Sequence, residues 1–171
     1  MFRVVSLFLL LLSHASAADQ PLYLCQPDEQ LIFGCEIEHK LLSVCASADV
    51  SNTSGYVQYR FGKPGKIELT YPAAKVAPQG KFFLASAGFS GGGANIIRFN
   101  NSGYEYLVFD RMRRTNFTPG EPHDAEFHAG IVTRRYGKIT STRLCDNNDA
   151  SVRAVAFEVL ETEEFDYSVL P

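Results

Sequence analysis

Residues 56–71 read YVQYRFGKPGKIELTY, and this stretch indicates the fold class more directly than any other. Its first part, residues 56–61, is aromatic and β-branched, which is typical of strands. Its last part, residues 66–71, alternates strictly between polar and apolar side chains, as a half-buried strand does. The glycines and proline of residues 62–65 are typical of a turn. The stretch therefore predicts an antiparallel β-hairpin.

Short segments of the same kind recur along most of the chain. They are separated by turn-forming residues at intervals of roughly 8–12 residues, as in all-β sandwiches and barrels. We expect these further strands at residues 32–37, 41–46, 81–87, 94–99, 104–112, 125–133 and 138–145. The pattern predicts a mainly β protein, an antiparallel barrel or sandwich of about eight strands.

Two segments between the expected strands carry no strand pattern. Residues 113–124 are polar and irregular, so we expect a loop there. The glycine-rich residues 88–93 invite comparison with a phosphate-binding loop, but no Lys-Ser/Thr pair and no helix pattern follow them. We interpret them as a flexible connection between strands, where the bare backbone would let a partner approach closely.

The end of the chain differs from the rest. Residues 146–149 are a polar cluster suited to capping a helix. Residues 151–161 place apolar side chains three and four positions apart, which predicts one amphipathic helix. The last acidic residues have no compensating base near them in the sequence, so we expect a solvated acidic tail. These residues are Glu158, Glu161, Glu163, Glu164 and Asp166.

The start of the chain has the three parts of a secretory signal peptide. Arg3 supplies the positive charge, residues 4–12 the apolar run, and residues 15–17 (Ala-Ser-Ala) the cleavage signal. The run is shorter than the about 20 residues that a membrane-spanning helix needs. We therefore expect a signal peptide at residues 1–17, a single β-rich domain at residues 18–171, no membrane span, and a periplasmic or secreted protein.

The cysteines agree with export. Cys25, Cys35, Cys45 and Cys145 are even in number, which in an oxidising compartment favours two disulfides. Their spacing lacks the close pairs of a zinc site, so no metal site is expected. Cys35 and Cys45 lie on the two expected strands around residues 38–40, so either these two bond or one of them reaches Cys145. We favour a bond from Cys145 to this first hairpin, because the longest loop constrains the unfolded chain most.

Composition and motifs limit the possible functions. The net charge of −3 and the 46% hydrophobic content indicate a globular domain that is not a general nucleic-acid binder. Two basic clusters, residues 111–114 and Arg134-Arg135, have aromatic residues near them in the sequence, which leaves a patch for an anionic ligand or nucleic acid as an alternative. We favour ordinary loop charge that the acidic tail offsets. No cofactor motif occurs, and no cofactor is expected.

One group of residues leaves an enzyme as the alternative. His123, Asp124, Glu126 and His128 lie close together in the sequence and could serve a small periplasmic hydrolase or ligand-binding protein. However, residues five apart on a strand point to opposite faces, so His123 and His128 are not expected to converge. We therefore favour a protein that is not an enzyme, with a structural envelope protein as a further alternative.

The segment Ser102-Gly103-Tyr104-Glu105-Tyr106 places a Ser-Gly turn before a strand with two tyrosines on one face. It resembles the Ser-Gly-x-x-Tyr loop of small bacterial lysozyme inhibitors at Ser102, Gly103 and Tyr106. Those inhibitors are exported single β-domains, and their loop enters the active-site cleft of lysozyme. A second stretch, residues 55–63, is similar to uncharacterised exported proteins of bacteria.

We therefore expect an exported, disulfide-stapled binding module, similar to a lysozyme inhibitor, with a protein such as lysozyme as its partner. The expected binding residues are Ser102, Gly103, Tyr104 and Tyr106. Tyrosine supplies rigid contact area and glycine lets the partner's surface come close, which suits such a site.

Overall fold

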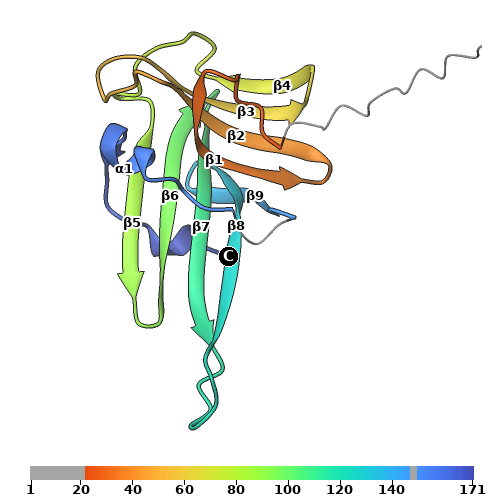
Figure 1. Cartoon of the computed structure of the whole chain (residues 1–171), viewed down its shortest axis with the longest axis vertical. Coiled ribbons are helices and arrows are strands. Elements are labelled where there is room, and N and C mark those ends of the chain that lie inside the picture. Colours follow the sequence, from red (N-terminus) through yellow and green to blue (C-terminus); the bar gives the residue numbers. More distant parts are fainter. Residues whose placement is uncertain (1–21, 147–149) are drawn as a thin grey trace, which may run out of the picture.

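The computed structural model describes residues 22–146 and 150–171. The predicted signal peptide lies outside the described residues, as do residues 147–149 of the polar cluster. Figure 1 shows two β-sheets packed against each other, with the long strands of the second sheet continuing beyond the edge of the first. No helix among the described residues is long and apolar enough to cross a membrane.

The first sheet contains four antiparallel strands that follow one another in the chain. They are β1 (Glu29–Ile37), β2 (Lys40–Ser47), β3 (Val57–Lys63) and β4 (Lys66–Tyr71). The hairpin predicted from residues 56–71 is confirmed as β3 and β4. Their register shifts at Gly62, which has a φ of 145° and whose missing Cβ would lie 2.5 Å from a backbone oxygen of β4. Only glycine fits such a position without strain.

The second sheet contains six strands in the order β10-β5-β6-β7-β8-β9. Its strands are β5 (Phe83–Phe89), β6 (Gly92–Asn101), β7 (Tyr104–Thr115), β8 (Asp124–Arg135), β9 (Lys138–Leu144) and the short β10 (Glu161–Thr162). The first five of these in the chain pair antiparallel, and β10 lies parallel to β5. The mainly β prediction is confirmed as a sandwich, with ten strands among the described residues rather than about eight.

The two segments expected to be irregular are shorter in the structure than predicted, and residues 88–93 are mostly strand. β7 continues to Thr115 and β8 begins at Asp124, so the connection between them is residues 116–123 and the hairpin projects from the body as an arm (Figure 1). In the glycine-rich stretch only Ser90 and Gly91 form the turn, and Gly91 has a φ of 81°. Cross-strand pairing extends these strands further than side-chain pattern alone predicts.

The main core lies between the sheets and is rich in aromatic rings. Phe99 of β6 is fully buried and stacks nearly parallel on Tyr106 of β7, with ring centroids 4.8 Å apart. Tyr71 of β4 stacks on Phe99 at the same separation, and Tyr59 of β3 lies 4.9 Å away. Burying one such ring contributes about 1.5–3 kcal/mol, so this cluster holds the two sheets together.

A second, smaller core covers the outer face of the six-stranded sheet. Val169 of the 3₁₀ helix η1 (Tyr167–Val169) packs there with Phe165 and Leu170. The acidic tail differs from the expected solvated segment at two positions. Glu163 accepts hydrogen bonds from Nε and Nη2 of Arg98, and Asp166 Oδ2 lies 2.7 Å from Arg134 Nη1. The compensating bases are distant in the sequence, on β6 and β8.

The C-terminal helix is much shorter than expected. α1 covers only Val155–Val159 rather than residues 151–161. The backbone N–H of Val152 donates to Asp110 Oδ2, and that of Arg153 donates to the carbonyl of Ile32, each at 2.8 Å. These tertiary hydrogen bonds hold residues 152 and 153 against β7 and β1 in a conformation that is not helical. Beyond α1 the chain becomes extended and pairs with β5 as β10.

All four cysteines form disulfides, as predicted. Cys35 of β1 bonds Cys145, which follows β9, so this bridge joins the two sheets across 110 residues. Cys25 bonds Cys45 of β2 across 20 residues. The favoured bond from Cys145 to the first hairpin is confirmed. Two disulfides are compatible with an exported, stapled module.

Candidate functional site

The predicted Ser-Gly turn joins β6 to β7 and is exposed. Ser102 and Gly103 have φ values of 53° and 78°, and Asn101 pairs with Tyr104 across the turn. Positive φ at both central positions is typical of the two-residue hairpin turn that matches strand twist. The backbone of this turn is therefore set by the sheet below it.

A second turn of the same geometry joins β8 to β9. Tyr136 and Gly137 have φ values of 50° and 74°. Glu105 of β7 pairs with Arg134 of β8, so the start of β7 lies beside the end of β8. The two turns consequently lie at the same end of the six-stranded sheet.

Arg135 connects the two turns. Its guanidinium carbon lies 5.0 Å from the ring centroid of Tyr104 and 5.1 Å from that of Tyr136. Its Nη1 also lies 3.5 Å from the Tyr104 hydroxyl. Cation–π contacts of this kind hold the charged group in place although it is exposed. We define the turn surface as Ser102, Gly103, Tyr104, Arg135 and Tyr136.

Tyr106, the fourth predicted binding residue, is not part of this surface. It is half-buried, and its ring lies parallel to that of Phe99 in the core between the sheets. Burial raises the pKa of its hydroxyl. The structure therefore brings three of the four predicted residues together, and adds Arg135 and Tyr136, which the sequence analysis did not select as binding residues.

Arg135 has no acidic partner among the described residues, unlike Arg134 beside it and Arg113 on the arm. Arg134 is paired with Glu105 and Asp166, and Arg113 with Glu126 at 2.5 Å. The prediction that loop charge is offset by the tail thus fits Arg134, whereas Arg135 remains available to an anionic partner.

The residues of the enzyme alternative are only partly brought together. Glu126 and His128 share the outer face of β8, with Glu126 Oε1 3.4 Å from His128 Nε2, although this contact is not oriented as a hydrogen bond. His123 lies in the loop at the end of the arm, where Nδ1 contacts the carbonyl of Asn116. The hydrogen bond from Arg113 lowers the pKa of Glu126. The ionised form of this carboxyl group is therefore favoured, and the group is not poised to donate a proton as a general acid.

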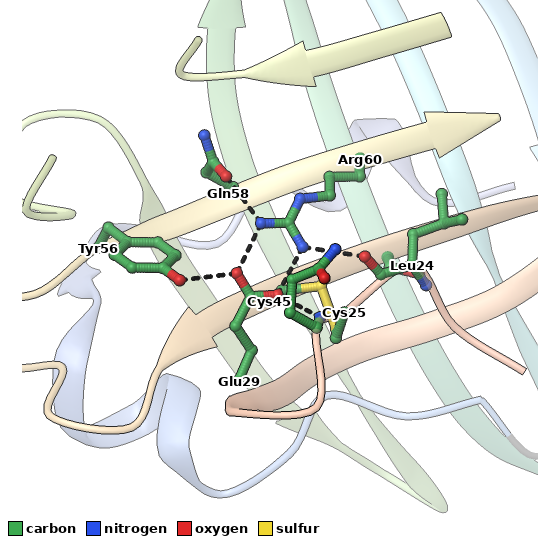
Figure 2. Close-up of a disulfide and its surroundings, with 9 residues drawn as sticks. Leu24, Cys25, Glu29, Cys45, Tyr56, Gln58 and Arg60 are labelled. Atoms are coloured by element: carbon green, nitrogen blue, oxygen red, sulfur yellow. Dashed lines mark hydrogen bonds and ion pairs between the residues drawn. A yellow bond between two sulfur atoms is a disulfide. The ribbon is translucent and has the colours of Figure 1, made fainter. Parts of the chain in front are cut away.

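A buried polar cluster lies beside the Cys25–Cys45 disulfide on the outer face of the four-stranded sheet (Figure 2). Glu29 accepts hydrogen bonds from Arg60 and from the hydroxyl of Tyr56, the latter at 2.8 Å. Burial raises the pKa of Glu29, but the hydrogen bonds outweigh this effect and bring the pKa to about 2. This cluster was not predicted from the sequence, where its one local signal is a charged residue within the aromatic strand at residues 56–61.

Glu29 and the two disulfide cysteines beside it, Cys25 and Cys45, have their possible metal-ligating atoms within 4.8 Å of one another. They are the one such group among the described residues. Both sulfurs are joined in the disulfide, and the carboxylate is occupied by Arg60. Because cysteine binds a metal only as a free thiolate, these residues do not fit a metal ion in the oxidised protein.

Comparison of the chain with protein-family models, curated proteins and solved structures gives no significant match. The candidate site therefore rests on the geometry described here.

Proposed function

We propose that this protein is an exported binding module that contacts a protein partner through the turn surface. The observation that carries the proposal is the contact of the Arg135 guanidinium with the rings of both Tyr104 and Tyr136. Tyrosine and arginine are the residue types that dominate binding energy at protein interfaces. Serine and glycine complete a composition typical of binding loops.

The rigidity of the surface supports the same proposal. Both turns are short, and each connects neighbouring antiparallel strands of one sheet. The arginine is already ordered by two rings before a partner arrives. Binding therefore costs little side-chain entropy, which otherwise reduces affinity by about 0.5–1.5 kcal/mol for each immobilised side chain.

The chemistry of Arg135 favours a partner with a carboxylate-lined cleft. Glycoside hydrolases place a pair of carboxyl groups around the bond that they cleave. A projecting arginine flanked by tyrosines is complementary to such a cleft in charge and shape. In its finer form the proposal is therefore inhibition of a lysozyme, with Tyr104 and Tyr136 taking the contact role that the resemblance assigns to Tyr106.

Inhibition of lysozyme is tested with the oxidised protein and a suspension of bacterial cell walls. We expect the parent protein to slow the clearing of the suspension, and R135A and Y136A to raise the inhibition constant by about tenfold or more. R113A serves as a matched control, because it removes an exposed arginine from the arm at the other end of β7.

Two results would count against the proposal, at different levels. A correctly oxidised parent that inhibits no lysozyme tested would exclude the finer form. The broader form would be wrong if partners retained from an exported protein fraction by immobilised parent were retained equally by R135A and Y136A.

A further inference from the structure

The strands of the six-stranded sheet continue past the four-stranded sheet at the end opposite the turn surface (Figure 1). On this extension lies a groove of about 710 Å³, lined by residues of β6, β7 and β8 and by Ala150 and Ser151. Asp110 and Met112 of β7 follow the buried Val108 at alternate positions, so their side chains share the face that packs in the main core.

Strand register makes the floor of the groove flat. Gly88 pairs with Gly93, Gly93 with Met112, and Met112 with Phe127, so these four residues form one row across β5, β6, β7 and β8. The last three line the groove, and Gly88 continues the row beside it. Half of the row is bare backbone, and a Cβ at Gly88 would meet no atom within 4 Å. The other half is apolar, and Phe127 is 49% exposed.

The neighbouring row is polar and connected by hydrogen bonds. Ser86 donates to Asn95 Oδ1 at 2.7 Å, and Asn95 Nδ2 donates to Asp110 Oδ1 at 2.8 Å. Asp110 also accepts from the backbone N–H groups of Asn95 and Val152. The bond to Val152 holds residues 150–152 against this face, where Ala150 and Ser151 line the groove.

These contacts leave Asp110 with acceptor capacity. A carboxylate offers about four lone-pair sites, and three donors reach it here. Because Asp110 is partly buried, its carboxylate is less well solvated than one in water, and this raises its pKa. A ligand that brings an N–H or O–H group would supply the missing donor.

We propose that the groove binds a small molecule with a flat apolar ring system and at least one hydrogen-bond donor. The flat body would lie on the row from Gly88 to Phe127, and the donor would face Asp110. The volume falls within the 300–1,000 Å³ range typical of small-molecule sites. A methionine beside an aromatic ring accommodates ring systems of varied outline.

The probe for the test is N-phenyl-1-naphthylamine, a flat aromatic molecule with one N–H group whose fluorescence rises in apolar surroundings. We expect the full-length oxidised protein to bind it saturably at one site. F127A removes an apolar side chain that lines the groove, and the leucine of G88L, directly beside Gly93, would reach over the bare part of the floor. Each should weaken binding by about tenfold or more, because truncating or blocking a pocket contact costs on the order of 1.4 kcal/mol or more. 1-Phenylnaphthalene, which lacks the N–H group, should bind the parent at least about threefold more weakly, as expected for one lost hydrogen bond.

Y136A is the control, because it alters the turn surface at the opposite end and should bind the probe like the parent. Urea unfolding midpoints show whether G88L folds, and F127A supplies an independent test because Phe127 is half exposed. The proposal would be overturned by probe binding that does not saturate or that both groove variants retain. It would also be overturned if light scattering showed a dimer that excludes the probe, since a second copy would then occupy the groove. None of these results depends on lysozyme inhibition.

Discussion

Glu29 and Arg60 form a two-point ion pair on the outer face of the four-stranded sheet. Arg60 Nη1 lies 2.5 Å from Glu29 Oε2, and Nη2 lies 2.6 Å from Oε1. The side chain of Glu29 is fully buried and that of Arg60 is 8% exposed. Arg60 also donates to the carbonyl of Leu24, so the pair fastens the segment that carries Cys25 to the sheet (Figure 2).

Removing one member of this pair should destabilise the protein strongly. R60M leaves the Glu29 carboxylate buried without its cation, and the free energy of unfolding should fall by about 3–5 kcal/mol. The double variant E29L/R60M removes both charges and should recover much of this loss. Urea unfolding followed by circular dichroism measures both values.

The control is the exposed pair between Lys40 and Glu68, whose side chains are about one-third exposed. K40M should cost at most about 1 kcal/mol, because water screens the exposed pair. An R60M protein as stable as K40M would show that the buried pair contributes little.

Stability should fall in acid through Glu29. Its pKa is lowered from 4.5 to about 2 in the folded protein, so the unfolded chain binds a proton more readily. The stabilisation is therefore fully present above pH 4.5 and is lost as the pH falls toward 2. It amounts to about 3 kcal/mol. Asp110 acts in the opposite direction, because burial raises its folded pKa.

Comparing urea midpoints of the parent and E29Q between pH 7 and pH 2 checks this assignment. The difference in stability between the two proteins should shrink as the pH falls through that window. A constant difference would mean that another carboxyl causes the acid sensitivity.

The two disulfides should contribute unequally. Loop-closure entropy predicts about 5 kcal/mol for Cys35–Cys145, which closes 110 residues, and about 3 kcal/mol for Cys25–Cys45, which closes 20. Double alanine variants of each pair, unfolded in urea, measure the difference. Thiol titration of the denatured protein, isolated from its natural source, should find no free thiol, and four free thiols would contradict the pairing.

The two tyrosines of the Ser-Gly-x-x-Tyr segment should behave differently. Y106A removes a ring stacked on Phe99 and should lower the free energy of unfolding by about 2–3 kcal/mol, whereas Y106F keeps the stack and should cost much less. Y136A removes an 87% exposed ring and should change stability by no more than about 0.5 kcal/mol. If Y106A were as stable as Y136A, the stacked position of Tyr106 would be wrong.

The hairpins could be predicted because their signals are local. Alternation at residues 66–71 and the turn before them specify neighbours in the chain, and the structure confirms them as β3 and β4. The helix at residues 151–161 was predicted from an equally local pattern, yet the structure has a helix only at Val155–Val159. Val152 and Arg153 at its predicted start are instead held by Asp110 and Ile32, which are far away in the sequence.

The residues of the candidate site were also only partly predictable from local signals. Ser102 and Gly103 were predictable because turn chemistry depends on residue type. Tyr104 and Tyr106 share one strand face, and nothing local distinguishes the ring that stacks on Phe99 from the ring that contacts Arg135.

The sequence by itself determined the strands, the tight turns and the even set of cysteines, because strand periodicity, left-handed turn residues and thiol number are properties of neighbouring or counted residues. Only the tertiary structure decided that Arg135 contacts both Tyr104 and Tyr136, that Glu29 meets Arg60, and that Gly93 and Phe127 line one groove. These contacts join separate strands, and their geometry is set by register and by the packing of the two sheets, which no short stretch of the chain encodes.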